Sequence, residues 1–258
     1  MTHPQAEGGS EAQETDYDVV IVGYGPTGEM LAILLGQLGY RVGVFERWPE
    51  VYALPRAVHF DDEIGRILQA AGLREEVLEI TDPVLDLYEW RNRDGEALLR
   101  IDWSRPGTRG WPSANFFSQP ELQRVLDRRA KSLATVEVRE GWEVGRIEDR
   151  GDHVHVEVQR GDSGQAGEWI AEDDVRWVTA RYLIGADGAN SAVREIIGSE
   201  WHDLGFVPVR LADPRSDPAR SGAGLEPDEL AVVRSDPADH DRVGRTGPAS
   251  LGVHASAG

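Results

Sequence analysis

Residues 17–46 constrain the fold more than any other part of the chain. Tyr17 to Val22 (YDVVIV) is a short apolar, β-branched run, which predicts a strand. Leucine and isoleucine then recur at helical spacing as far as Leu38, and Gly39 is a natural helix end. A second apolar run covers Arg41 to Phe45. The order strand, turn, helix, strand predicts a βαβ unit, which needs about 30 residues.

The turn after the first strand has the pattern GxGxxG. Gly23 permits a tight turn, Gly25 lets the backbone approach a pyrophosphate, and Gly28 allows the helix to pack closely on the strand. The helix begins with Pro26 and Thr27, and its N-terminus would face the phosphates. The pattern alone could also be a glycine-rich turn without a ligand, but the flanking strand and helix favour dinucleotide binding.

Glu46 and Arg47 follow the second strand, and both are predicted cofactor residues. The Glu46 carboxylate can accept hydrogen bonds from both ribose hydroxyls and would repel a 2′-phosphate. We therefore expect the adenosine of FAD or of NAD, and not that of NADP. This part of the chain leaves the choice between FAD and NAD open.

Composition narrows the class of partner. The chain has 258 residues, 40% of them hydrophobic and 28% charged, which suffices for one large domain or two small ones. A net charge of -19 disfavours nucleic acid and anionic membranes and favours a small molecule. The chain has no cysteine, which excludes thiolate metal ligands and cysteine nucleophiles. We predict no metal site, and the sequence does not identify a catalytic residue. Because there is no apolar stretch of about 18 residues and no signal-peptide pattern, we expect a cytoplasmic protein. Its oligomeric state is not indicated.

The rest of the chain predicts a mixed α/β fold. A helix is expected from Asp61 to Ala71, a hairpin with an Asp94-Gly95 turn between Val84 and Ile101, and a second helix from Pro120. Alternating residues from Val136 to Gln159, with Trp169 to Val178 as a third strand, predict an antiparallel meander. Separate from the meander, Arg181 to Ala186 predicts a strand that leads into a short helix, Ser191 to Ile197.

That last strand runs into GADGANSAVR, and here the chain resembles the FAD-dependent aromatic hydroxylases of the para-hydroxybenzoate hydroxylase type. The family pattern DGxxSxVR matches at Asp187, Gly188, Ser191, Val193 and Arg194. The resemblance implies that this segment contacts the ribityl and pyrophosphate part of FAD. A simple strand-to-helix turn is the alternative, which the presence of two motifs in order disfavours.

Two weaker matches support the resemblance. In PRAVHFDDE, Arg56 would lie on the pyrophosphate, although a surface arginine has the same sequence signal. In FFSQPEL, Gln119 would contact the flavin from a helix start, and an ordinary helix cap is the alternative. His59 has no evident partner and is interpreted as a surface residue. These segments are most similar to the 3-(3-hydroxyphenyl)propionate hydroxylase branch.

The resemblance implies a function. A monooxygenase of this family would use FAD, NADH or NADPH, and oxygen to hydroxylate a phenolic compound. One alternative is a catalytically inactive cofactor-binding fragment. Another is a different flavin oxidoreductase of the same fold, such as a halogenase or reductase.

The predicted domain organisation has three parts. Residues 1–16 form a disordered leader, and residues 17–206 form a Rossmann-like FAD-binding domain with part of a β substrate domain at 84–118. Residues 207–258 lack large aromatic side chains, isoleucine and lysine, and cannot bury much core. This tail is either a natural disordered linker or the product of a shifted reading frame. The small set of residue types in it favours the shifted frame. Because the later Gly-Asp motif of the family is missing, we expect a truncated chain.

Overall fold

The computed structural model describes residues 14–50, 57–92, 94–164, 168–200, 202 and 232–233. These residues fall into two compact units. The first comprises the described residues up to Val58 together with Gly65–Thr81 and Phe117–Glu200. The second is made mainly of His59–Ile64 and Asp82–Phe116.

The first unit is an α/β structure on a six-stranded sheet with the strand order β8-β2-β1-β11-β10-β9. Parallel pairing joins β8, β2, β1 and β11, whereas β11, β10 and β9 pair antiparallel. This arrangement confirms the predicted Rossmann-like fold with an antiparallel meander. Its elements are β1 (Tyr17–Val22), α1 (Pro26–Gln37), β2 (Val42–Glu46), α3 (Arg74–Glu79), α4 (Gln119–Lys131), β8 (Val136–Glu140), β9 (Trp142–Asp149), β10 (Val154–Ser163), β11 (Trp169–Gly185) and α5 (Ala192–Ile196).

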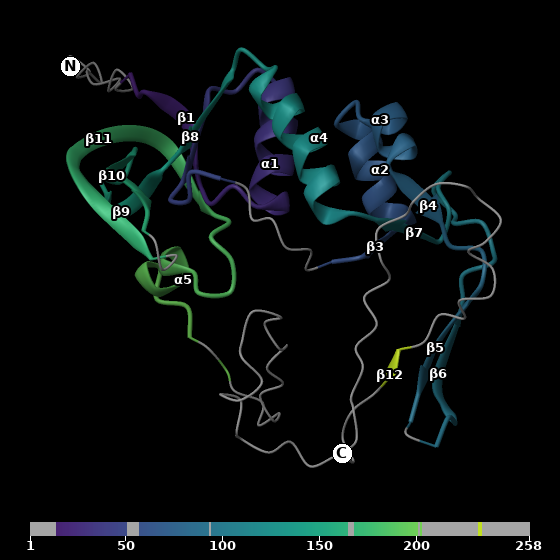
Figure 1. Cartoon of the computed structure of the whole chain (residues 1–258). Coiled ribbons are helices and arrows are strands. Elements are labelled where there is room, and N and C mark those ends of the chain that lie inside the picture. Colours follow the sequence, from purple (N-terminus) through teal and green to yellow (C-terminus); the bar gives the residue numbers. More distant parts are fainter. Residues whose placement is uncertain are drawn as a thin grey trace, which may run out of the picture. The chain divides into compact units, whose positions relative to one another are not determined.

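The sheet of the first unit is covered on both faces. In Figure 1, α1 and α4 lie side by side on one side of β1, and the strands β9 to β11 curve away on the other. Side chains alternate along a strand, so Val20 and Val22 of β1 join a buried cluster with Val156 and Val178 from the meander. The end of β1 is therefore held by packing from both sides, and this end carries the GxGxxG turn.

The strand β11 differs from the sequence prediction. Trp169–Val178 and Arg181–Ala186 were expected as separate strands, but β11 runs without interruption from Trp169 to Gly185. One part pairs antiparallel with β10 and the other pairs parallel with β1, with Ala180 paired on both sides. No turn separates the two predicted strands, because neither Thr179 nor Ala180 is a residue type that favours turns. The meander and the parallel sheet are thus one continuous sheet.

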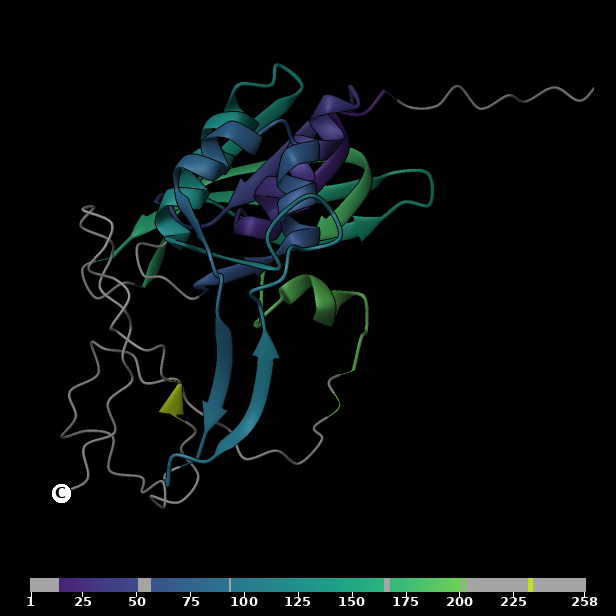
Figure 2. The same ribbon diagram turned by 90° about the vertical axis from the view of Figure 1, so that its right-hand side faces the viewer.

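The second unit contains a hairpin and a small sheet. The strands β5 (Leu87–Arg91) and β6 (Ala97–Asp102) form the expected hairpin around the Asp94-Gly95 turn, which Figure 2 shows as a long two-stranded ribbon. The other elements here are β3 (His59–Asp61), β4 (Thr81–Pro83), β7 (Ala114–Phe117) and the start of α2 (Asp62–Ala70). This unit overlaps the range 84–118 assigned to a substrate domain, and that assignment stays a prediction.

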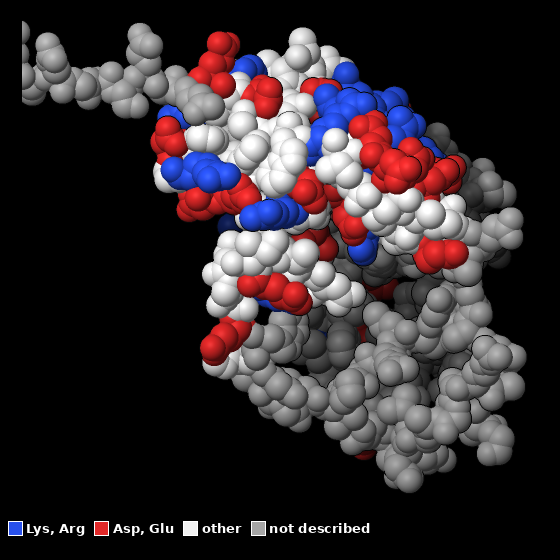
Figure 3. Space-filling view, turned by 90° about the vertical axis from the view of Figure 1, so that its left-hand side faces the viewer, with Lys and Arg blue, Asp and Glu red and all other residues white. Residues whose placement is uncertain are grey.

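Nearly all of the predicted leader and tail lie outside the described residues. The exception in the tail is β12 (Val232–Val233), which pairs antiparallel with Trp90 and Arg91 of β5. On the face drawn in Figure 3, acidic and basic side chains lie among one another. Among the described residues, no helix is long and apolar enough to span a membrane.

Candidate dinucleotide site

Two loops that are far apart in the sequence meet at the carboxyl ends of β1 and β11. The Ala186 N–H donates to the Val22 carbonyl at 2.7 Å. A Cβ on Gly23 would lie 2.5 Å from the Ala186 carbonyl oxygen and 2.9 Å from the Asp187 Cα. The GxGxxG turn and the Asp187-Gly188 turn are thus packed directly against each other, which the sequence could suggest only through the family resemblance.

The three glycines of the turn have the geometry that the pattern predicts. Gly23 has a φ of +98°, which strongly favours glycine. A Cβ on Gly28 would lie 2.1 Å from the Gly23 carbonyl oxygen, so only glycine lets α1 approach the strand this closely. Gly25 is different, because a Cβ there would meet no atom of the described residues within 4 Å. Open space therefore lies in front of the N-terminus of α1, where Pro26 and Thr27 are exposed.

Glu46 lies at the end of β2 and fixes the turn. One carboxylate oxygen accepts from the Tyr24 N–H at 2.8 Å, and the other accepts from the Trp48 N–H at 2.9 Å. A carboxylate has about four acceptor positions, so Glu46 can still accept from ribose hydroxyls. Arg47 is exposed, and its guanidinium lies 3.5 Å from the Glu143 carboxylate and over the Trp48 ring.

The Asp187-Gly188 motif is held by hydrogen bonds among its own residues. The Asp187 carboxylate accepts from the Ser191 hydroxyl at 2.5 Å and from the Val193 N–H at 3.2 Å. Ser191 is the N-cap of α5 and accepts from the Arg194 N–H at 3.0 Å, while the Arg194 guanidinium donates to the Ala189 carbonyl at 2.8 Å. Gly188 is exposed, and its φ of +80° strongly favours glycine. The network holds the glycine turn open beside Gly23.

The two weaker matches have different outcomes. Gln119 is buried at the start of α4 and accepts a hydrogen bond from the Ala57 N–H at 2.9 Å, so it holds the segment that follows Arg56. Arg56 itself lies outside the described residues. His59 is exposed, as expected, but its ring centroid lies 5.0 Å from that of Trp103 and 6.2 Å from that of Tyr88. These two aromatic rings are neighbours of His59 that the sequence did not identify.

Tyr24 within the turn and Glu29 directly after it are both buried, and neither was predicted as a site residue. The Tyr24 hydroxyl donates to the Asp127 carboxylate of α4 at 3.0 Å. Burial, and then the Asp127 charge, raise the pKa of Tyr24 well above its ordinary value. Glu29 stands directly after Gly28 and is fully buried. A glutamate in an otherwise apolar helical run was the only sequence signal.

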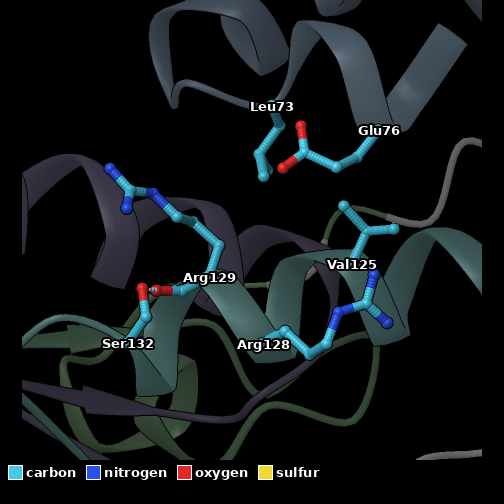
Figure 4. Close-up of a pocket in the computed structure, with 6 residues that line it drawn as sticks. All are labelled: Leu73, Glu76, Val125, Arg128, Arg129 and Ser132. Carbon is cyan, nitrogen blue, oxygen red and sulfur yellow. Dashed lines mark hydrogen bonds between the residues drawn. The ribbon is translucent and has the colours of Figure 1, made fainter.

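A separate depression of about 200 Å³ lies between the start of α3 and the outer face of α4. Leu73 and Glu76 point towards α4 across it (Figure 4). Arg128, Arg129 and Ser132 line the other side, and Ser132 donates to the Arg129 carbonyl. Because none of the predicted cofactor residues lines this depression, we do not assign it to the dinucleotide.

The residues at the two loops fit a flavin dinucleotide. The space in front of Gly25 suits a pyrophosphate, since a helix N-terminus and main-chain N–H groups there attract anions. Glu46 lies at the end of β2 beside this turn, and Gly188 is exposed in the neighbouring turn. A fold with this site defines an α/β dinucleotide-binding protein of the GxGxxG type.

Comparison with known proteins identifies the family. The model of the FAD binding domain family matches residues 16–223, and the chain belongs to this family. The match extends beyond the 17–206 expected from the sequence. A probable NADH-specific resorcinol 4-hydroxylase of Rhodococcus jostii (strain RHA1) is 43% identical over 190 residues, which are 73% of this chain and 34% of that protein.

Two further relatives agree with this assignment. A 3-(3-hydroxy-phenyl)propionate/3-hydroxycinnamic acid hydroxylase of Mycobacterium sp. (strain JLS) is 35% identical over 230 residues, covering 84% of this chain and 38% of that protein. The crystal structure of p-nitrophenol 4-monooxygenase from Pseudomonas putida DLL-E4 has a TM-score of 0.60 and 29% identity, covering 72% of this chain and 44% of that one. The chain spans about a third of the length of the curated relatives it matches.

Proposed function

We propose that this chain supplies the FAD site of a flavin-dependent monooxygenase that hydroxylates a phenolic compound with NADH and oxygen in the cytoplasm. The observation that carries the proposal is the packing of the Gly23 turn against Ala186 and Asp187. The names of the relatives support the substrate class, since resorcinol and 3-(3-hydroxyphenyl)propionate are phenols. NADH is proposed because the resorcinol hydroxylase relative is named as NADH-specific.

The proposed residues divide between two ends of the cofactor. Glu46 would hold the adenosine ribose, and Gly25 and the start of α1 would receive the pyrophosphate. The charge of the phosphates would be balanced by Arg56 and Arg194. The ribityl chain and the flavin would be flanked by Gly188, Ser191 and Gln119. When bound, FAD supplies the redox chemistry. In the proposed reaction, one oxygen atom of O₂ enters the phenol and the other leaves as water, with NADH and a proton as reductant.

Glu46→Ala is expected to weaken FAD binding by about tenfold or more. The change removes charge-assisted hydrogen bonds, each worth roughly 1.5–3 kcal/mol, and every 1.4 kcal/mol or so is a factor of about ten in affinity. It also frees the Tyr24 and Trp48 N–H groups that Glu46 holds. Quenching of flavin fluorescence during titration of the protein into FAD measures the affinity.

Glu75→Ala is the matched control, because Glu75 is an exposed carboxylate on α3, outside the site. FAD should bind this variant as it binds the unmodified chain. Equal FAD affinity in Glu46→Ala and Glu75→Ala would remove Glu46 from the site.

A second candidate is a chain that binds FAD without hydroxylating. The observation that favours this candidate is the exposure of apolar side chains on the β5–β6 hairpin, where Leu87, Trp90 and Leu99 are 40–55% exposed. A flavin hydroxylase must shield its reaction from water, and an exposed hairpin does not provide that shielding. The two candidates differ in one assay, in which FAD-loaded protein receives NADH or NADPH and either resorcinol or 3-(3-hydroxyphenyl)propionate. Hydroxylated product formed with NADH supports the monooxygenase. FAD binding without product supports the second candidate.

A further inference from the structure

Glu29 is a fully buried carboxyl group. It lies in the first turn of α1, immediately after the last glycine of the GxGxxG turn, and none of its surface is exposed. Neither carboxyl oxygen has a hydrogen-bond partner among the described residues. Gln123 of the neighbouring helix α4 is also buried, and its side-chain oxygen lacks a partner in the same way. A carboxyl group without a partner is expensive to bury when it is ionised.

The groups around Glu29 are unevenly charged. The Lys131 ammonium lies 2.7 Å from the Asp127 carboxylate and 3.0 Å from the Glu140 carboxylate, so it is already shared by two carboxylates. Asp127 also accepts from the Tyr24 hydroxyl. The titratable groups that interact electrostatically with Glu29 come from the turn, α4 and β8. They are Tyr24, Asp127, Lys131 and Glu140. No cation in this set is left to pair with an ionised Glu29.

These surroundings keep Glu29 neutral at physiological pH. Burial raises the pKa of Glu29 to about 9, the Asp127 and Glu140 charges add to the rise, and Lys131 opposes it. Burial lowers the pKa of Lys131, but hydrogen bonds to Asp127 and Glu140 outweigh this and hold it above its ordinary value. The pKa of Tyr24 is also raised. Because the pKa values of Tyr24 and Lys131 lie above their ordinary values, which are themselves above 9, Glu29 is the first of these three groups to lose its proton as the pH rises.

Glu29 is connected to the dinucleotide loop by short paths. Its N–H donates to the Gly25 carbonyl at 2.9 Å, the first bond of α1. Tyr24 links α4 to the end of β2, because its hydroxyl donates to Asp127 of α4 and its N–H donates to Glu46. A change in the packing of α1 on α4 would therefore move both Gly25 and the carboxylate proposed to hold the ribose.

We propose that Glu29 is a positioning residue of the dinucleotide loop that supports nucleotide binding in its neutral form and opposes it when ionised. An unpaired buried charge would force α1 and α4 to admit water or separate. A carboxylate one turn from the pyrophosphate would also repel that group in a medium of low dielectric constant. The inference rests on the proposed FAD site, because it concerns the affinity of that site.

The test uses ADP as the probe, since ADP carries the adenosine and phosphates without a flavin ring that would titrate in the same range. The dissociation constant is measured by calorimetry at pH 7.5 and at pH 10 for the unmodified chain and for Glu29→Gln, which has nearly the same shape and no charge. Glu75→Gln is the control for loss of a carboxylate elsewhere. The measured quantity is the ratio of the two constants within each protein.

In the unmodified chain and in Glu75→Gln, ADP binding should weaken about tenfold at pH 10, because about one molecule in ten then has a neutral Glu29. In Glu29→Gln the ratio should stay within about twofold of one. Equal ratios in all three proteins would overturn the role of Glu29 while leaving the nucleotide site intact. Absence of ADP binding at pH 7.5 in the unmodified chain would instead overturn the site itself and the inference with it.

A thermal measurement tests the protonation state without any nucleotide. The folded pKa of Glu29 lies above its ordinary value of 4.5, so its contribution to stability is complete below pH 4.5 and is lost as the pH rises towards 9. Glutamine has no such loss. The melting temperature of Glu29→Gln, and of a second variant, Glu29→Leu, should therefore exceed that of the unmodified chain by a margin that grows from pH 5 to pH 9. A constant margin would contradict a neutral Glu29.

Discussion

Gly25→Val is expected to weaken FAD binding by at least about a hundredfold while the chain remains folded, a loss of about 2.8 kcal/mol in binding free energy. A Cβ on Gly25 would meet no atom within 4 Å in the part of the chain that the structure describes, and its φ of -81° suits any residue. The valine side chain would therefore occupy only the open space that we assign to the pyrophosphate. Titration by fluorescence quenching or calorimetry measures the loss.

The stability of Gly25→Val should change little. Gly25 is the N-cap of α1, where valine is poorer than glycine by about 1 kcal/mol, which lowers the melting temperature by about 4 °C or less in a protein of this size. A variant that unfolds would point to a structural role for Gly25. A variant that is stable and binds FAD as tightly as the unmodified chain would show that the pyrophosphate lies elsewhere.

Gly28→Ala is expected to have the opposite effect, with a loss of about 3 kcal/mol or more in the free energy of unfolding. The added Cβ would lie 2.1 Å from the Gly23 carbonyl oxygen and 3.6 Å from the Ala186 Cβ. Main-chain atoms cannot rotate away as a side chain can, so α1 must move off β1. The gain of about 1 kcal/mol in helix propensity from glycine to alanine offsets only part of this cost.

Gly25→Ala is the matched control for Gly28→Ala, because the same methyl group is added three residues earlier in the same turn, into open space. Urea unfolding of the two variants compares them directly. Equal stability of both would mean that the turn is looser than the contact between Gly28 and Gly23 indicates.

The elements that could be predicted from the sequence are those defined by local patterns. The GxGxxG turn combines a strand, three glycines and a helix within a few residues, so each glycine could be assigned its role before its φ or its contacts were known. The cap of α5 is local as well, since Ser191 bonds the Arg194 N–H three residues later. The Asp94-Gly95 hairpin belongs to the same group.

The features that were missed depend on tertiary packing or on short segments. The helix α3 has six residues, and its sequence REEVLE offers Val77 as its buried side chain, too little for a periodic signal. The continuity of β11 depends on its two different neighbours, β10 and β1, which sequence alternation cannot distinguish. The environment of Glu29 arises from α4 and β8, which are distant in the sequence.

The central claim is that the Gly25 turn and the Gly188 turn form one FAD site. The most direct test follows the backbone amide signals of the ¹⁵N-labelled chain by NMR while FAD is added. We expect the amides of Gly25 and Thr27 and those of Gly188 and Ser191 to shift together, along one binding curve with one dissociation constant. Shifts confined to one of the two turns, or to neither at saturating FAD, would contradict it.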